Sequence, residues 1–445
     1  MENLIKKYNV AIPRYTSYPP VPNWNVNNWT PKKWQHTVEE SYYQSISEGI
    51  SLYIHLPFCE DLCTYCACNT RITKNHAVEV PYIEAVLKEW NMYLDILGTK
   101  PLLKELHLGG GTPTFFSPKN LGLLLENIHN TVQIADNAAF SFEGHPGNTT
   151  REHLEVLFKY GFKRISLGIQ DFDIKVQEII NRKQSVEQVV SVVNQAREIG
   201  YASVNFDLVY GLPLQKLEGL IDTIEKVIEM RPDRIAFYSY AHVPWVKPGQ
   251  RKFTSFHLPS ADEKLELYKV GREMLMNAGY LEVGMDHFSL PSDSLIEAQN
   301  NNTLHRNFMG YTDCHTLLNI ALGVSSISDS WYGFAQNVKE VEKYIQIVNE
   351  GSLPLLKGHI LSQEDLKIRQ IILDVMCKEK ILVPDGLNEL TIKKLEELII
   401  DGLIYKENNY LVITKTGKSF LRNIASVFDE YLEEVSGIEK FSLTV

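Results

Sequence analysis

The chain has 445 residues, more than one hydrophobic core usually serves, so we expect two or three domains. Apolar residues make up 44% and charged residues 22%, an ordinary globular composition, and no apolar run is long enough for a membrane span. The formal net charge of −11 argues against nucleic-acid binding, and the N-terminus lacks the apolar core of a signal peptide, so we predict a cytoplasmic protein.

The chain begins with a segment, 13–24, that is too rich in proline and aromatic residues for a helix. We expect residues 1–35 to form an extended arm over the active site. Beyond it, β-rich runs alternate with helical patterns such as 80–97 and 185–199, the second followed by Gly200, a helix stop. This alternation predicts parallel strands with right-handed crossovers. The candidate strands are 52–58, 105–111, 140–146, 164–170, 203–211 and 234–240.

Six such units predict an α/β catalytic domain over 36–360, either a partial barrel or an open sheet. Sites in parallel α/β folds collect at the carboxyl ends of the strands. Each candidate strand ends beside a chemically useful residue. These are Cys59, the Gly110-Gly111-Thr112 turn, Glu143, Gln170, Asp207 and Ala241.

The alternation of β-rich runs and helical patterns ends at about residue 361. Helical patterns cover 361–380 and 390–402, a hairpin is expected to turn at Asn408 and Asn409, and a last helix is expected over 418–435. This order predicts a small, winged-helix-like domain over 361–445. We favour a packing or substrate-covering role over DNA binding, because the acidic end of the segment suits phosphate poorly.

Four of the six cysteines lie within ten residues, at Cys59, Cys63, Cys66 and Cys68. A disulfide knot, a zinc site and an iron–sulfur cluster compete as explanations. An intracellular location argues against disulfides. Zinc sites usually combine two short ligand pairs across a longer loop, and no second pair is present, whereas tight spacing suits an iron–sulfur cluster. The sequence favours the cluster and leaves zinc open. We expect the isolated Cys314 and Cys377 to be structural.

The arrangement Cys59-x-x-x-Cys63-x-x-Cys66, with Tyr65 before the last cysteine, resembles the radical S-adenosylmethionine (SAM) superfamily. The resemblance implies that these three thiolates bind a [4Fe–4S] cluster and that SAM chelates its open iron. Reductive cleavage of SAM then supplies a 5′-deoxyadenosyl radical, so the cofactor carries the difficult chemistry.

Further motifs, in chain order, resemble the oxygen-independent coproporphyrinogen III oxidases, or coproporphyrinogen dehydrogenases, over nearly the whole chain. They are RYTSYP, LYIHLPFC, Cys68, LHLGGGTPT, GIQDF, NFDLVYGLP, MDHF and LHRNFMGYT. The resemblance implies a partial (β/α)6 radical-SAM-type barrel with an N-terminal extended arm and a small, mainly α C-terminal domain. It also implies an oxidoreductase of haem (porphyrin) biosynthesis that converts two propionates of coproporphyrinogen III to vinyl groups, giving protoporphyrinogen IX.

The resemblance assigns roles residue by residue. Cys68 would be needed for activity without binding iron. The positions that match the first SAM site are Tyr53, Gly110, Glu143, Gln170, Arg182 and Asp207. The positions that match a second SAM site are Tyr65, Ala67, Gly111, Thr112, Ala241 and Ile327. Two departures stand out: EGHPG over 143–147, expected to matter little, and Met309, where family members carry a glutamine that can donate a hydrogen bond.

The resemblance also implies partners: the tetrapyrrole substrate and an electron donor such as flavodoxin or ferredoxin, with the protein a monomer. Of the cations available for the substrate's propionates, it favours Arg14 and Arg251. Two other functions stay open. One is a haem carrier of the same superfamily, against which Cys68 argues, and the other is an anaerobic haem-degrading methyltransferase. Only a product assay excludes the second.

Overall fold

The computed structural model describes residues 2–384 and 386–432, and its centre is a twelve-stranded sheet. Six neighbouring strands of this sheet run parallel, which confirms the predicted strands and their pairing. In spatial order they are β1 (Ile50–Leu56), β4 (Leu102–Gly110), β5 (Gln133–Gly144), β6 (Phe162–Gln170), β7 (Ser203–Tyr210) and β8 (Arg234–Ser239).

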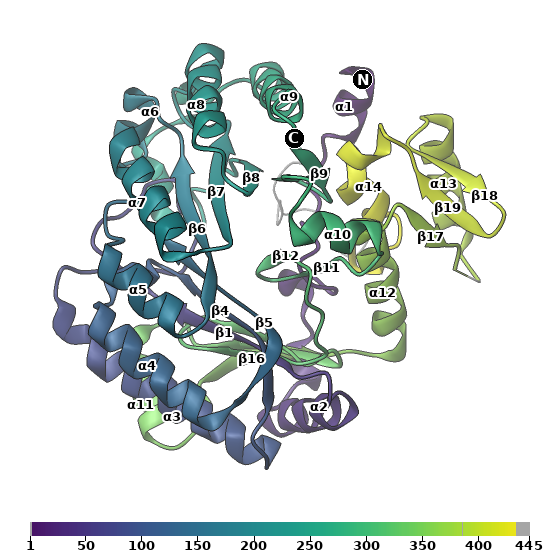
Figure 1. The fold of residues 1–445 in the computed structure, drawn as a ribbon. Coiled ribbons are helices and arrows are strands. Elements are labelled where there is room, and N and C mark those ends of the chain that lie inside the picture. The colour runs from purple at the N-terminus through teal and green to yellow at the C-terminus, as the bar shows by residue number, and fades with distance from the viewer. Residues whose placement is uncertain (1, 385, 433–445) are drawn as a thin grey trace.

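Helices between successive strands cover the outer face of this parallel sheet (Figure 1). They are α3 (Glu79–Leu97), α4 (Pro118–Thr131), α5 (Arg151–Lys159), α6 (Ile174–Ile179), α7 (Val186–Ile199) and α8 (Leu217–Met230). Local sequence explains α7: Ser185 and Gln188 form a reciprocal capping box at its start, and Gly200, at φ 109°, ends it. The predicted helices over 80–97 and 185–199 are confirmed.

The sheet extends beyond the six parallel strands on both sides, which the sequence did not predict. Next to β1 lie β13 (Asn319–Leu322), β14 (Ile327–Asp329), β15 (Gly333–Asn337) and β16 (Leu355–Ile360), of which only β13 is parallel to its neighbour β1. Next to β8 lie β10 (His287–Ser289) and then β9 (Leu281–Val283). These strands have three to six residues, too few for an alternating pattern to show.

Smaller elements connect these parts. They are the two-stranded pairs β2 (Phe58–Cys59) with β3 (Arg71–Ile72) and β11 (His305–Asn307) with β12 (Gly310–Thr312), and the helices α9 (Ala261–Asn277), α10 (Ser294–Asn300) and α11 (Val341–Asn349). None of the described helices is long and apolar enough to cross a membrane.

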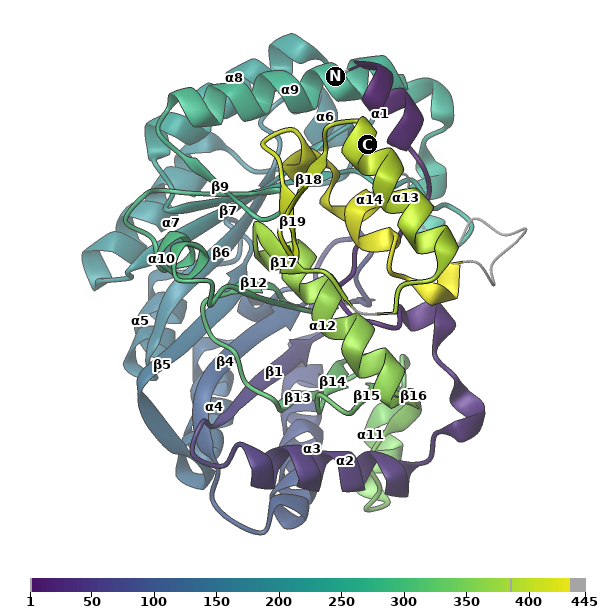
Figure 2. The ribbon, with the colours of Figure 1, turned by 90° about the vertical axis from the view of Figure 1, so that its right-hand side faces the viewer.

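The C-terminal elements lie on the side of the sheet opposite α3–α8 (Figures 1 and 2). They are α12 (Gln363–Cys377), β17 (Lys380–Leu382), α13 (Glu389–Ile400), β18 (Ile404–Glu407), β19 (Tyr410–Ile413) and α14 (Leu421–Ser426). The hairpin predicted at Asn408 is confirmed, while β17 was missed. The single last helix was wrong: α14 ends at Ser426, and the chain then turns so that Asp429 accepts a hydrogen bond from Tyr15. Residues 433–435 of that prediction lie outside the described residues.

The N-terminal arm consists of α1 (Glu2–Tyr8), an irregular stretch and two short 3-10 turns, and α2 (Pro31–Gln44) follows it. The irregular stretch packs into a second hydrophobic core shared with α12–α14, where Tyr15 and Tyr18 are only 3% and 1% exposed. The arm therefore contributes to the C-terminal core, and its expected place over the active site stays a prediction. The expected boundary at 35/36 falls inside α2.

Candidate active site

The carboxyl ends of the parallel strands open into a cavity of about 550 Å³, which we call the strand-end cavity. A loop after β2 carries the clustered cysteines along its wall. Most of the residues expected in a cofactor site line it. They are Cys59, Cys63, Tyr65, Cys66, Ala67, Cys68, Gly110, Gly111, Thr112, Glu143, Gln170, Arg182 and Asp207.

The cysteines are free thiols, so the disulfide alternative has no support in the structure. Cys59 Sγ lies 3.4 Å from Thr112 Oγ1, and Arg182 Nη1 donates to Cys63 Sγ at 3.7 Å. The backbone N–H of Cys68 donates to Cys66 Sγ at 3.4 Å. The loop thus brings three thiols to one cavity beside a guanidinium group.

The thiols differ in acidity. Burial raises the pKa of Cys59 to about 11 and also raises that of Cys63. The Cys68 side chain donates to Cys66 and lowers the pKa of Cys66 to about 6, while the pKa of Cys68 is raised by the same contact. Cys66 is therefore the thiolate most easily formed, and Cys68, which lines the same cavity, supports it.

The spacing of the thiols bears on the zinc alternative. Within residues 2–384 and 386–432, no three metal-binding side chains are grouped as the ligands of a single ion would be. A [4Fe–4S] cluster binds each thiolate through a different iron, so its ligands need not converge on one point as zinc ligands do. The donor set of three cysteines around a cavity fits the cluster better than it fits zinc.

The glycine turn after β4 forms the part of the wall nearest β1. Gly110 has φ 114°, and a Cβ there would lie 2.7 Å from the ring of His55. A Cβ on Gly111 would lie 2.5 Å from the carbonyl oxygen of Pro57. The Gly111 N–H donates to the carbonyl oxygen of Leu56 at the end of β1, at 2.8 Å, and the Thr112 N–H donates to that of Phe58 in β2, at 3.1 Å. Only glycine allows this close approach of the two strand ends.

Glu143 presents a fixed carboxylate to the cavity. Its Oε2 accepts from the N–H of Gly110 at 3.1 Å, and its Oε1 lies 3.5 Å from His107 Nε2. The side chain remains 45% exposed because it faces the cavity. Burial acts to raise the pKa of Glu143, but His107 and the Gly110 N–H hold it below the usual value. An ionised carboxylate with free lone pairs can accept an ammonium group.

Asp207, three residues before the end of β7, is a second carboxylate of different character. It accepts hydrogen bonds from Ser166 Oγ at 3.0 Å and Asn205 Nδ2 at 2.9 Å. Burial, reinforced by the charge of Glu143, raises the pKa of Asp207 to about 6. Its orientation is fixed by two donors, which leaves acceptor positions for a ligand's hydroxyl groups.

Arg182 is fixed by Gly168, whose carbonyl oxygen accepts from Nε at 3.0 Å and Nη2 at 2.6 Å. A Cβ on Gly168 would lie 2.6 Å from the amide of Gln170, so this glycine is needed to admit both side chains. Gln170 itself has φ 65°, a left-handed conformation that turns the chain at the end of β6.

Three predicted residues do not line the strand-end cavity. The Tyr53 hydroxyl lies 3.1 Å from His55 Nδ1, and its ring stacks on His107 behind Glu143. Ala241 follows β8, and Ile327 packs beside a separate cluster around Trp24 and Phe334. Sequence reasoning missed His107, Ser166 and Asn205. The period-two pattern of inward-facing positions on β4, β6 and β7 could have found them.

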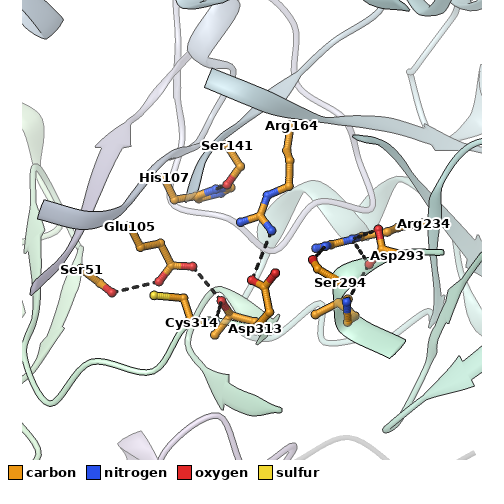
Figure 3. A network of polar contacts seen from close by, with 12 residues as sticks. Ser51, Glu105, His107, Ser141, Arg164, Arg234, Asp293, Ser294, Asp313 and Cys314 are labelled. Atoms are coloured by element: carbon orange, nitrogen blue, oxygen red, sulfur yellow. Dashed lines mark hydrogen bonds and ion pairs between the residues drawn. The ribbon is translucent and has the colours of Figure 1, made fainter. Parts of the chain in front are cut away.

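A smaller cavity of about 240 Å³ adjoins the strand-end cavity inside the barrel and shares Glu143 and Asp207 with it; Met309 also lines it. Its floor is a network of buried charges (Figure 3). Arg164 donates to Asp313 at 3.4 Å, Arg234 pairs with Asp293 at 2.8 Å, and Glu105 accepts from Ser51 and Thr312. The paired charges close this end of the barrel, so the open end is at the cysteines.

Comparison with known proteins identifies the class first. A family model of the Radical SAM superfamily matches residues 53–227, which include the cysteine loop, the glycine turn, Glu143 and Asp207. Fold and site together define a radical SAM enzyme, a class that implies a [4Fe–4S] cluster and SAM.

Relatives that span the whole chain identify the family. Oxygen-independent coproporphyrinogen III oxidases from Synechocystis sp. and Helicobacter pylori are 36% and 37% identical to this chain, covering 99% of it and 97% and 98% of their own lengths. The solved structure of coproporphyrinogen III oxidase from Escherichia coli, described as a Radical SAM enzyme, has a TM-score of 0.91 at 33% identity, covering 97% of this chain and 99% of that one. The chain belongs to the oxygen-independent coproporphyrinogen III oxidase family.

Proposed function

We propose that this enzyme converts two propionate side chains of coproporphyrinogen III to vinyl groups without oxygen, giving protoporphyrinogen IX in haem biosynthesis. Each propionate loses one hydrogen atom, carbon dioxide and one electron. The observation that carries the proposal is the strand-end cavity, which brings three cysteines together with Glu143, Arg182 and Asp207. SAM bound to a [4Fe–4S] cluster would supply the radical that removes hydrogen from carbon.

Different residues of the chain would bind the cluster and the separate groups of SAM. Cys59, Cys63 and Cys66 would hold the cluster, and Cys68 would act in turnover rather than as an iron ligand. Glu143, held by Gly110 and His107, suits the ammonium group of SAM, and Arg182 suits its carboxylate. Asp207 suits the ribose hydroxyls, because Ser166 and Asn205 already fix its orientation.

A second SAM is a finer part of the proposal. Tyr65, Ala67, Gly111 and Thr112 line the strand-end cavity, and Met309 lines the adjoining one. Because the thioether of Met309 cannot donate a hydrogen bond, we expect the second SAM to be held by packing and backbone groups. Equilibrium binding should approach two SAM per cluster. A value of one in a fully active enzyme would contradict the two-site proposal.

Anaerobic incubation of the reconstituted protein with coproporphyrinogen III, SAM and a reductant tests the function directly. Mass analysis should show a product that has lost two of its four carboxyl groups as carbon dioxide and gained two vinyl groups. A protein that binds haem without turnover, or that consumes haem, would instead be the carrier or the methyltransferase. The cytoplasmic location and the monomeric state stay predictions.

A further inference from the structure

An exposed basic segment lies outside the strand-end cavity, against the cysteine loop. No acidic residue occurs between Asp233 and Asp262, although the chain has 55 Asp and Glu residues and a net charge of −11. Residues 241–257 of this stretch, which we call the basic strap, contain Lys247, Arg251 and Lys252. None of its residues lines the strand-end cavity. The strap therefore concentrates positive charge on an acidic protein, away from the cofactor cavity.

Hydrogen bonds attach the basic strap to the cysteine loop. Gln250, which is completely buried, donates from Nε2 to the carbonyl oxygens of Tyr65 at 3.0 Å and Ala241 at 3.2 Å. Lys247 Nζ donates to the carbonyl oxygen of Cys68 at 3.3 Å. Gly249 also lies beside Leu62, with its Cβ position 3.6 Å from a Leu62 methyl. The outer surface of the strap is thus separated from the cysteines by only one layer of chain.

The outer face of the strap combines apolar and cationic side chains. Trp245, Val246 and Phe256 are 58%, 62% and 98% exposed, and Leu62 of the cysteine loop is 40% exposed. Among the described residues, none of the strap's three cations forms an ion pair; Arg251, for example, donates to the carbonyl oxygen of Pro244. The neighbouring cysteine loop contributes two acids.

Those acids are Glu60, which lies 3.7 Å from His76, and Asp61. The strap itself contributes no acid to offset its own cations. Exposed aromatic side chains on a segment whose cations form no ion pairs are typical of a surface that binds an acidic protein.

We propose that the basic strap is the docking surface for a small acidic protein that carries one electron at a time. This inference rests on the proposed function, because the cluster must receive one electron before SAM is cleaved. The reduced carrier gives up one electron to the cluster behind the cysteine loop and leaves oxidised by one electron. Elsewhere the net negative charge of the chain repels an acidic carrier, so the strap directs it to the cysteines.

The test is the rate at which reduced flavodoxin, an acidic flavin carrier, reduces the reconstituted cluster. The variant Lys252→Glu/Ser255→Glu reverses charge on the exposed face of the strap without touching the cysteine loop. The control Lys32→Glu/Gln35→Glu makes the same change on α2, which packs on β15 and β16 at the opposite end of the sheet. Bleaching of the cluster's visible absorbance is followed with flavodoxin and, separately, with dithionite, which needs no docking surface.

The strap variant should raise the flavodoxin concentration needed for half-maximal reduction by about tenfold and weaken its dependence on salt. Reduction by dithionite should stay within about twofold of the unmodified protein, and the control should match the unmodified protein in both assays. Trp245→Ser should weaken flavodoxin reduction while leaving its salt dependence unchanged.

Unchanged flavodoxin kinetics in the strap variant would overturn the inference. So would an equal loss with dithionite, which would mean that the strap only supports the cysteine loop. Weaker binding of coproporphyrin III with normal flavodoxin kinetics would assign the strap to substrate instead. If flavodoxin reduces the cluster and SAM is cleaved but no vinyl product forms, the proposed function fails while the docking surface stands.

Discussion

At the scale of single residues, we expect the clustered cysteines to have two roles. All four line the strand-end cavity; Cys63 accepts from Arg182, and Cys68 contacts Cys66 through its thiol and its N–H. We expect Cys59→Ala, Cys63→Ala or Cys66→Ala to abolish the cluster's visible absorbance. Cys68→Ala should keep the iron and lose turnover. Loss of iron from Cys68→Ala, measured by iron content after reconstitution, would show that Cys68 is a ligand.

Two buried arginines are expected to change the free energy of unfolding in opposite directions when each is replaced by methionine. Arg306 and Arg369 are both 6% exposed and both stack on an aromatic ring. Arg369 pairs with Asp329 at 2.6 Å, whereas Nε and Nη1 of Arg306 have no partner among the described residues. Arg306→Met should raise the free energy of unfolding by about 1–3 kcal/mol, because it removes two buried N–H groups without partners at the cost of one long bond from Nη2 to the Arg14 carbonyl oxygen at 3.4 Å.

The matched change Arg369→Met should lower the free energy of unfolding by about 3–5 kcal/mol, because it leaves the Asp329 carboxylate unpaired. Urea denaturation of both variants measures the two effects. A loss of stability in Arg306→Met as large as that in Arg369→Met would contradict the prediction and mean that the Arg306 guanidinium is compensated in the folded protein.

At the scale of elements, Glu89 joins α3 to the far edge of the sheet. It accepts from the Gly323 N–H at 2.8 Å, from Asn337 Nδ2 at 2.6 Å and from the Tyr344 hydroxyl. Burial raises the pKa of Glu89 to about 7 in spite of these bonds. The unfolded chain ionises near the ordinary carboxyl pKa, so this group disfavours folding progressively as pH rises from about 4.5 to 7, by at most about 3 kcal/mol.

Glu89→Gln removes this titration. The melting temperature of the unmodified protein minus that of Glu89→Gln should therefore decrease as the pH rises from 5 to 8. Glu84→Gln, on the exposed face of the same helix, is the control and should track the unmodified protein. A difference between the unmodified protein and Glu89→Gln that does not change with pH would mean that Glu89 has the same protonation state in the folded and unfolded chain.

At the scale of the whole molecule, the described residues form two large hydrophobic cores, and the arm belongs to the second. Tyr15 donates to Asp429 at 2.9 Å, and Arg422 donates to the carbonyl of Pro13 at 3.2 Å. Arg14 reaches toward the barrel and pairs with Asp286 at 3.1 Å. The arm thus links the C-terminal core to the end of β8.

Deleting residues 1–20 should expose the C-terminal core while leaving the barrel folded. Burial of the arm's apolar side chains contributes about 1.5–3 kcal/mol each, so amide exchange in α12 and α14 should speed up by at least about 100-fold. The cluster and reductive SAM cleavage should survive, and vinyl formation should stop. Hydrogen-exchange mass spectrometry measures the first effect. Unchanged protection in α12, or decarboxylation at the full rate, would show that the arm is dispensable.

The sequence alone predicted the six parallel strands, their helices and most of the strand-end cavity. The strands and helices depend on local period, helix caps and the rule that parallel strands place their carboxyl ends together, all of which are properties of short segments, whereas most cofactor residues were assigned through the family resemblance. The cysteine motif could also be recognised from the sequence, because its spacing lies within one loop. Cys59, Glu143 and Asp207 were therefore found without coordinates.

The tertiary structure alone decided what depends on contacts between distant segments. The short strands β13–β16 are placed by pairing with their neighbours, and α14 ends at Ser426, where the chain turns so that Asp429 can meet Tyr15 of the arm. His107 gained its role only when folding brought it 3.5 Å from Glu143. Such pairs leave no local period in the chain, because their free energy comes from burial and hydrogen bonds formed across hundreds of residues.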